Sequence, residues 1–152
     1  MSQIPKSLQT GLSIVDHEHQ TLLNLLDRAK AVCPIRPAGK CSECPPERAR
    51  QCFVAFERIL NETINYMLDH FAREDRMMET LVPKEHADRH QAAHADIADA
   101  VMRLTTYLDS GKTAQTSQEL TDVFERWLIG HIADYDLELA RLIAEKDAAG
   151  KV

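Results

Sequence analysis

The chain has 152 residues and a formal net charge of −6, with 24 acidic against 18 basic side chains. This length suits one domain with its own core, residues 1–152, without disulfide support. The acidic balance argues against nucleic acid and anionic membranes as partners, because both attract basic patches. No stretch approaches the ~20 apolar residues of a membrane span, and the start lacks the apolar run of a signal peptide. We therefore expect a soluble, cytoplasmic protein.

The composition favours helices over strands. Only five glycines occur and aromatic residues make up 5% of the chain, whereas residues that form helices well are frequent. In chain order, an irregular arm is followed by four stripes of apolar residues with helical period and by one loop rich in cysteine and proline. We predict helices over 13–32, 47–80, 84–109 and 117–147, an arm over 1–12 and the loop over 33–46.

Local signals define several helix ends. Ser13–Asp16 has the spacing of a capping motif, and Thr116–Glu119 has the pattern of a capping box. Pro83 separates the second helix from the third, and residues 109–111 are a stop signal for the third. Amphipathic helices with mostly short connections indicate an all-α fold, an antiparallel up-down four-helix bundle.

Two pairs of metal-binding residue types occur at the helical spacing i, i+4. They are His70 with Glu74, and His90 with His94. Side chains four residues apart emerge within about 40° of each other on one face of a helix. Both pairs continue apolar stripes, so we expect them to face the core. Buried imidazoles and carboxylates need compensation for lost hydration, and a bound cation compensates several of them at once.

Two further histidines, His19 and His131, lie on the apolar stripes of the first and fourth helices. Because the core of a four-helix bundle is shared, we expect them to join the same metal site. Five imidazoles with carboxylate and without thiolate are typical of non-haem iron, with manganese and zinc as alternatives by ligand type. The ligands are too many for one ion with an open position, which indicates two ions sharing carboxylates.

Four segments carry a family resemblance: V-D-H-E-H at 15–19, H-F-A-R-E-D-R-M-M at 70–78, H-Q-A-A-H at 90–94 and H-I-A-D-Y-D at 131–136. In this order, over nearly the whole chain, they resemble the hemerythrins, specifically the bacterial hemerythrin-like domains. The resemblance implies a bundle that binds O2 at two iron ions with an oxo or hydroxo bridge. It implies these metal ligands: His19, His70, Glu74, His90, His94, His131 and Asp136.

The acidic ligand after His131 is implied by the resemblance and not by helical geometry. On an α-helix Asp134 lies about 60° from His131, whereas Asp136 lies about 140° away. The spacing alone therefore favours Asp134. The family pattern H-I-x-x-x-D selects Asp136 as the bridging carboxylate.

The chain departs from the family pattern in two connections. The connection over 33–52 is longer and richer in cysteine than usual, and the segment before His90 is also longer. The second departure leaves His86 with His90 as an alternative ligand pair, although His90 and His94 continue better into the apolar stripe. We expect His17 and His86 to be surplus histidines on the surface.

Apolar side chains near the ligands are candidates for the wall of an O2 pocket. They are Leu23, Met78, Ile97 and Trp127.

The four cysteines have the symmetric spacing C-x7-C-x2-C-x7-C. Three interpretations stay open: a second metal site holding zinc, a redox-active thiol set, and reduced thiols packed in the fold. At ~1.5 Å per helical residue these thiols are too far from the histidines to bind the same ions. The cysteines are Cys33, Cys41, Cys44 and Cys52.

We therefore predict a non-enzymatic di-iron domain that binds O2 reversibly. The favoured use is an oxygen or redox sensor in a signalling protein such as a diguanylate cyclase, with a C-terminal output domain or a homodimer as partner. A stand-alone O2 carrier or store is one alternative. A di-iron enzyme that handles peroxide, nitric oxide or iron–sulfur repair is another.

Overall fold

The computed structural model describes residues 2–33, 41–106, 108 and 112–150. Within them the chain is helical and contains no strand, so the all-α prediction is confirmed. The long helices are α1 (Ser13–Ala31), α2 (Pro46–Leu81), α3 (Lys84–Thr105), α4 (Thr113–His131) and α5 (Leu137–Ala149). The short elements are the 3-10 turns η1 (Lys6–Leu8) and η2 (Cys41–Glu43) and the π-helical turn η4 (Ile132–Asp136).

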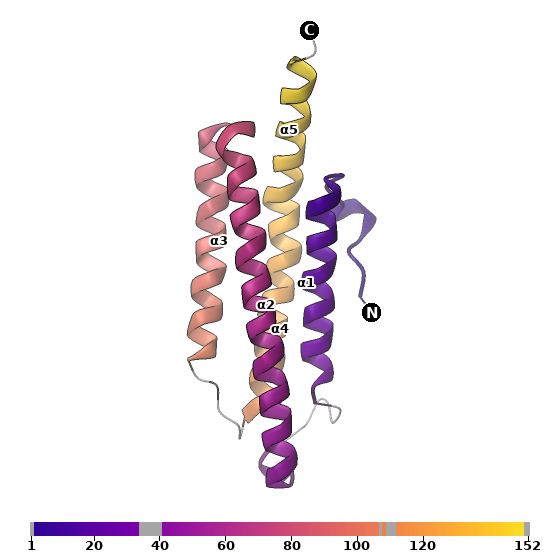
Figure 1. The fold of residues 1–152 in the computed structure, drawn as a ribbon, viewed down its shortest axis with the longest axis vertical. Helices are drawn as coiled ribbons and strands as arrows, with labels where there is room; N and C mark the ends of the chain where they lie inside the picture. The colour runs from indigo at the N-terminus through magenta and orange to yellow at the C-terminus, as the bar shows by residue number, and fades with distance from the viewer. Residues whose placement is uncertain (1, 34–40, 107, 109–111, 151–152) are drawn as a thin grey trace.

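The described helices form a bundle of four columns, because α4, η4 and α5 continue as one column (Figure 1). α1 and α3 each pack against α2 and against α4. Successive columns run in opposite directions in Figure 1, and α2 and α5 extend past their neighbours at opposite ends. None of the described helices is long and apolar enough to span a membrane.

The start of α1 differs from the predicted capping motif Ser13–Asp16. No side chain caps this helix. The Asp16 carboxylate instead accepts hydrogen bonds from the backbone N–H groups of Thr10 at 2.7 Å and Gly11 at 3.0 Å. Gly11 has a φ of +80°, a left-handed conformation that favours glycine. Asp16 therefore holds the turn that leads into the helix, and the predicted cap is wrong.

Other helix ends also differ from the predicted bounds. α3 ends at Thr105, short of the predicted 109, and the predicted stop at 109–111 lies outside the described residues. α4 begins at Thr113, before the predicted capping box. Within this helix Ser117, next to the predicted cap Thr116, is buried and donates a hydrogen bond to the Ala29 carbonyl of α1 at 3.1 Å. Residues 34–40, most of the predicted loop, also lie outside the described part.

The N-terminal arm packs along α1. The backbone N–H and hydroxyl of Ser2 donate hydrogen bonds to the Asp27 carboxylate at 2.6 and 2.8 Å. The N–H of Ile4 donates to the Gln20 side chain at 3.1 Å, and the side chain of Ile4 is buried. These contacts fix a segment that has no long helix of its own.

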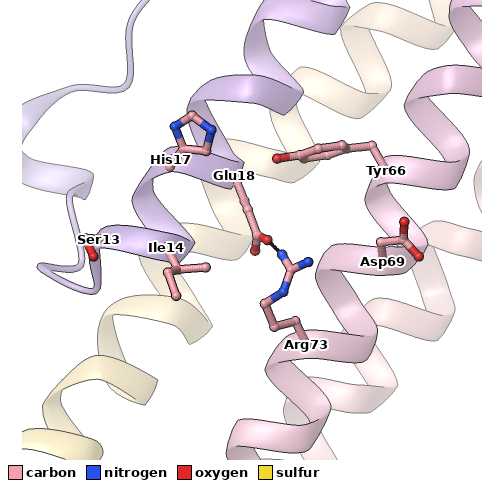
Figure 2. Close-up of a pocket in the computed structure, with 7 residues that line it drawn as sticks. All are labelled: Ser13, Ile14, His17, Glu18, Tyr66, Asp69 and Arg73. Atoms are coloured by element: carbon pink, nitrogen blue, oxygen red, sulfur yellow. Dashed lines mark ion pairs between the residues drawn. The ribbon is translucent and has the colours of Figure 1, made fainter.

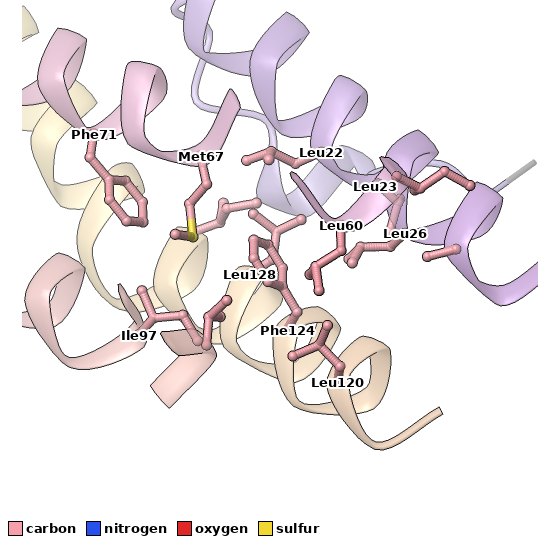
Figure 3. Close-up of a cluster of buried hydrophobic side chains, with 14 of the residues drawn as sticks. Leu22, Leu23, Leu26, Leu60, Met67, Phe71, Ile97, Leu120, Phe124 and Leu128 are labelled. Atoms are coloured by element: carbon pink, nitrogen blue, oxygen red, sulfur yellow. The ribbon is translucent and has the colours of Figure 1, made fainter. Parts of the chain in front are cut away.

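Apolar side chains fill the bundle on both sides of one polar layer. Along α2 the buried positions are first Leu60 and Met67, then His70 and Glu74, and then Met78. Burying a Leu or Phe side chain contributes about 1.5–3 kcal/mol, so the larger cluster provides most of this stabilisation. The larger cluster (Figure 3) includes Leu22, Leu23, Leu26, Phe56, Leu60, Met67, Ile97, Phe124 and Leu128. The smaller cluster consists of Met78, Leu139 and Ile143.

Candidate metal centre

The polar layer between the two apolar clusters contains all seven side chains that the sequence singled out as metal ligands. α1 supplies one histidine, α2 a histidine and a glutamate, α3 two histidines, α4 one histidine and η4 one aspartate. Each of these residues is buried, at 4% exposure or less. They are His19, His70, Glu74, His90, His94, His131 and Asp136.

The ligand atoms form two groups, in each of which all atoms lie within 4.8 Å of one another. Glu74 belongs to both groups. In the larger group the Nε2 atom of His131 lies 2.8 Å from that of His90 and 3.1 Å from that of His94. Nitrogen ligands about 2.1 Å from one metal ion and at right angles to each other stand about 3 Å apart. The larger group is Glu74, His90, His94 and His131; the smaller is His19, His70 and Glu74.

Glu74 and Asp136 each span the two groups. For Glu74, Oε1 lies 3.6 Å from Nε2 of His70, while Oε2 lies 3.2 Å from Nε2 of His94. For Asp136, Oδ2 lies 3.0 Å from Nε2 of His19, while Oδ1 lies 3.0 Å from Nε2 of His90. In both carboxylates one oxygen faces the first group and the other oxygen faces the second.

The buried polar atoms of this layer test whether metal ions suit it. Both oxygens of Glu74, both oxygens of Asp136, and Nε2 of His19 and His70 lack a hydrogen-bond partner of good geometry. Leaving a buried polar group without a partner costs roughly 2–7 kcal/mol. Cations held between these nitrogens and oxygens satisfy them together, so the residues present fit a bound metal.

The electrostatics of the metal-free layer follow from the same contacts. Burial raises the pKa of Glu74, but the imidazoles of His90 and His94 outweigh burial and bring it to about 2. Burial also raises the pKa of Asp136, and the surrounding imidazoles hold it well below its ordinary value. Burial lowers the pKa of His90, but Asp136 and Glu74 raise it to about 9. In this layer the carboxylates of Glu74 and Asp136 therefore stay ionised beside the positively charged imidazole of His90.

His70 and His94 each have Nδ1 turned toward an outer carboxylate, while Nε2 faces inward. Nδ1 of His70 lies 2.9 Å from the buried carboxylate of Glu18, and Nδ1 of His94 lies 3.5 Å from Asp75. Such outer partners fix the tautomer and the orientation of a metal-binding imidazole. Residue-type patterns did not single out Glu18 or Asp75, although each directly precedes or follows a predicted ligand.

Glu18 also forms an ion pair with Arg73 of α2, as Figure 2 shows. The pair lines a surface pocket of about 330 Å³ between α1 and α2. Tyr66 and Asp69 line the same pocket from α2. The outer partner of His70 is therefore held in place by a cation at the surface of the bundle.

His86 corrects one prediction from the sequence. It was expected on the surface, but it is 3% exposed, and its Nε2 lies 3.2 Å from Nδ1 of His90. Its spacing of four residues before His90 continues the histidine stripe of α3, and this signal could have placed it inside. Nε2 of His94, and not His86, reaches Glu74. His17, the other surplus histidine, is exposed as expected.

The π-helical turn η4 explains how Asp136 reaches the layer. Its hydrogen bonds join residues five apart, as the bond from the Leu137 N–H to the Ile132 carbonyl does. A turn of this kind brings residue i+5 to the same side as residue i, and Oδ1 of Asp136 lies 3.2 Å from Nε2 of His131. Asp134, which α-helical spacing favours, is exposed.

Aromatic rings enclose the larger group. The ring of Phe71 stacks on His94 with centroids 3.9 Å apart, and the ring of Trp127 stacks on His131 at 4.6 Å. Of the four predicted pocket residues, Leu23 and Ile97 belong to the larger apolar cluster. Trp127 is partly buried and packs against the same cluster. Met78 lies in the smaller cluster on the other side of the polar layer. The O2 pocket formed by these residues stays a prediction.

The four cysteines lie at the far end of the larger cluster and are free thiols. Sγ of Cys52 lies 3.8 Å from the Val32 carbonyl, next to Cys33, and Sγ of Cys41 accepts a hydrogen bond from the Ala114 N–H at 3.2 Å. Burial and then the neighbouring Cys33 raise the pKa of the Cys52 thiol. Among the described residues no cysteine belongs to a group of three or more metal-binding atoms.

The fold and this layer define a metal-binding helical bundle. The family model for the hemerythrin HHE cation binding domain matches residues 10–143. The chain therefore belongs to the hemerythrin family, and the resemblance noted from its motifs is confirmed.

Curated relatives agree with the family assignment. The bacteriohemerythrin of Pseudomonas aeruginosa strain LESB58 is 21% identical over 151 residues, which cover 94% of this chain and 87% of that protein. The bacteriohemerythrin of Pseudomonas paraeruginosa strain DSM 24068 / PA7 is 25% identical over 154 residues, with the same coverage. No solved structure matches this chain.

Proposed function

We propose that this domain holds two non-haem iron ions and binds O2 reversibly. The observation that carries the proposal is that Glu74 and Asp136 each turn one oxygen to each group of histidines. Two carboxylates that span two groups of imidazoles suit a pair of ions better than one ion. Imidazole and carboxylate without thiolate are ligands that suit non-haem iron.

The two positions differ in the number of imidazoles around them. One group contains three histidines and the other contains two, His19 and His70. With both carboxylates shared, the two-histidine position has one protein ligand fewer, so it has room for an exogenous ligand. Two ferrous ions, when bound, supply the electrons that reversible O2 binding requires. We therefore assign O2 binding to the side of His19 and His70.

The surrounding residues keep water and protons away from this position. Leu22 and Leu23 lie beside His19 on α1 and are at most 3% exposed. Phe71, next to His70, is also buried. Limited access of water and protons favours the return of O2 over its release as peroxide. We accordingly propose a binding domain and not an enzyme.

Sensing is our proposal for the use of O2 binding, in a signalling protein such as a diguanylate cyclase. It is supported by α5, which directly follows Asp136 and extends past the other helices (Figure 1). A stand-alone carrier or store is the alternative. Hydrogen exchange in α5 distinguishes them, since a sensor should show O2-dependent protection there and a carrier should not.

Metal analysis combined with O2 titration tests the proposal. We expect two irons per chain in protein produced with iron, and visible absorption that appears when the reduced protein meets O2 and disappears when O2 is removed. One tightly bound zinc without iron would refute the metal assignment. Continuous O2 consumption with peroxide or water released over many turnovers would establish an enzyme instead.

A further inference from the structure

A second buried histidine and a carboxylate extend outward from His90. His86 lies one turn before His90 on α3, and its Nε2 is 3.2 Å from Nδ1 of His90. Its Nδ1 is 3.3 Å from Oε2 of Glu138 on α5. The side chain of Glu138 is 33% exposed and lies 3.5 Å from Arg89 and 3.8 Å from Arg141. The contacts thus run without a gap from the metal layer to the surface.

The chemistry of donors and acceptors decides which atoms carry hydrogen in the series His90, His86 and Glu138. The carboxylate of Glu138 can only accept, so the tautomer of His86 that suits this contact has its hydrogen on Nδ1, which faces Oε2 of Glu138 at 3.3 Å without the geometry of a good hydrogen bond. A neutral His86 then has a lone pair on Nε2, which accepts the N–H of His90. His90 can then offer the lone pair of its own Nε2 to a metal ion, which would replace the proton that this nitrogen carries in the metal-free layer. That atom lies in the metal layer, 3.4 Å from Glu74, 3.0 Å from Asp136 and 2.8 Å from His131.

We propose that His86 and Glu138 are positioning residues that set the orientation and the donor strength of His90. This inference rests on the proposed metal centre. An imidazole whose outer N–H is held by a basic acceptor is oriented toward the metal and becomes a stronger donor. A stronger donor favours the more positively charged state of the metal. Removing the contacts should therefore weaken metal binding and raise the reduction potential.

The contacts of His86 go beyond the packing of a core histidine. Both of its ring nitrogens face a partner, although the residue is almost fully buried. Nδ1 of His70 is hydrogen-bonded to Glu18, and Nδ1 of His94 faces Asp75 at 3.5 Å. His90 instead reaches its carboxylate through a second imidazole, and that carboxylate belongs to α5. The contact therefore links α3 to α5 on the far side of the π-helical turn.

Three variants separate positioning from packing. His86→Leu removes both ring contacts, and His86→Gln retains an amide that accepts from His90 and donates to Glu138. Glu138→Gln retains an acceptor but removes the charge. Glu145→Gln is the control, because this glutamate lies two turns on in α5, is 60% exposed and pairs only with Arg141 among the ion pairs of the described residues.

The measurements are iron affinity by competition with a chelator, without O2, and the midpoint reduction potential. His86→Leu should lower iron affinity about 10–100-fold, the usual effect of losing an outer partner of a metal ligand. His86→Gln should restore most of that affinity. Glu138→Gln should raise the midpoint potential with a smaller loss of affinity, and Glu145→Gln should match the unaltered protein in both.

Each contrary result has a distinct meaning. If the unaltered protein binds two irons and neither His86→Leu nor Glu138→Gln changes affinity or potential, this inference is refuted and the proposed function stands. Equal losses in His86→Leu and His86→Gln would reduce His86 to packing and also refute it. If His86→Leu does not fold, the potential of Glu138→Gln decides. An unaltered protein that takes up no iron would overturn both proposals.

Discussion

Replacing Asp136 by alanine should remove the stabilisation that iron gives to the folded protein. The two oxygens of Asp136 face both groups of histidines, so the change weakens both ion positions. Asp134→Ala is the matched control, because Asp134 lies two residues away, in the same π-helical turn, and is exposed. An exposed substitution of this kind usually changes stability by no more than about 0.5 kcal/mol.

The size of the effect follows from linkage between binding and folding. A ligand at about 1,000 times its Kd stabilises the folded state by about 4 kcal/mol per site. For a chain of this length each kcal/mol shifts Tm by about 2–4 °C. Ferrous iron should therefore raise Tm of the unaltered protein and of Asp134→Ala by about 8–16 °C or more, and Asp136→Ala should lose most of this rise.

Scanning calorimetry of each protein with and without iron, under anaerobic conditions, measures this difference. Comparing each variant with its own metal-free form cancels the effect of the substitution on the empty bundle. Iron content after desalting gives an independent measurement on the same samples. The reasoning fails if Asp134→Ala loses the iron-dependent rise while Asp136→Ala keeps it, since the turn would then present the other carboxylate to the metal.

Three further predictions concern the ligands, the core and the cysteines. His70→Ala should lose at least one iron by metal analysis, because His70 is one of two histidines in its group; an unchanged iron content, equal to that of His17→Ala on the surface, would contradict this. Phe56→Ala should lower the free energy of unfolding in urea by about 3–5 kcal/mol, since Phe56 is fully buried; a loss below about 1 kcal/mol would show that the cluster collapses around the gap. The double variant Cys41→Ser, Cys44→Ser should bind O2 normally, and thiol titration and zinc analysis of the unaltered protein should give four free thiols and no zinc; altered O2 affinity in the variant or bound zinc in the unaltered protein would give the cysteines a functional role.

Helical spacing predicted those parts of the site that lie on regular α-helix. His70 with Glu74 and His90 with His94 lie at i, i+4 on α2 and α3, and both pairs face the core as their apolar stripes indicated. Asp136 could not be found in this way, because it lies in a π-helical turn where α-helical angles do not apply. The family pattern H-I-x-x-x-D selected Asp136, and α-helical spacing alone favoured Asp134.

The residues that the sequence misplaced depend on contacts between distant segments. The outer nitrogen of the buried His86 faces Glu138, a residue more than fifty positions later in the chain. Glu18 is buried, and His70 and Arg73 of the next helix pair with its carboxylate. In α4 Ser117, next to the predicted cap, lies inside the helix and contacts Ala29 of α1. Local patterns do not record such pairings, so the predicted helix order agreed with the structure better than the predicted ends did.

The shared carboxylates have a consequence for how the centre fills. The first ion would draw one oxygen of Glu74 and one of Asp136 toward itself, which leaves the second oxygen of each already oriented and dehydrated for the next ion. Much of the free-energy cost of orienting the two carboxylates thus falls on binding of the first ion. The second ion then meets a site that is already ordered, and such a site binds its ligand more tightly. Loading should then be cooperative. A sample given half the iron it can hold would contain mainly empty and fully loaded chains, with few chains holding one ion.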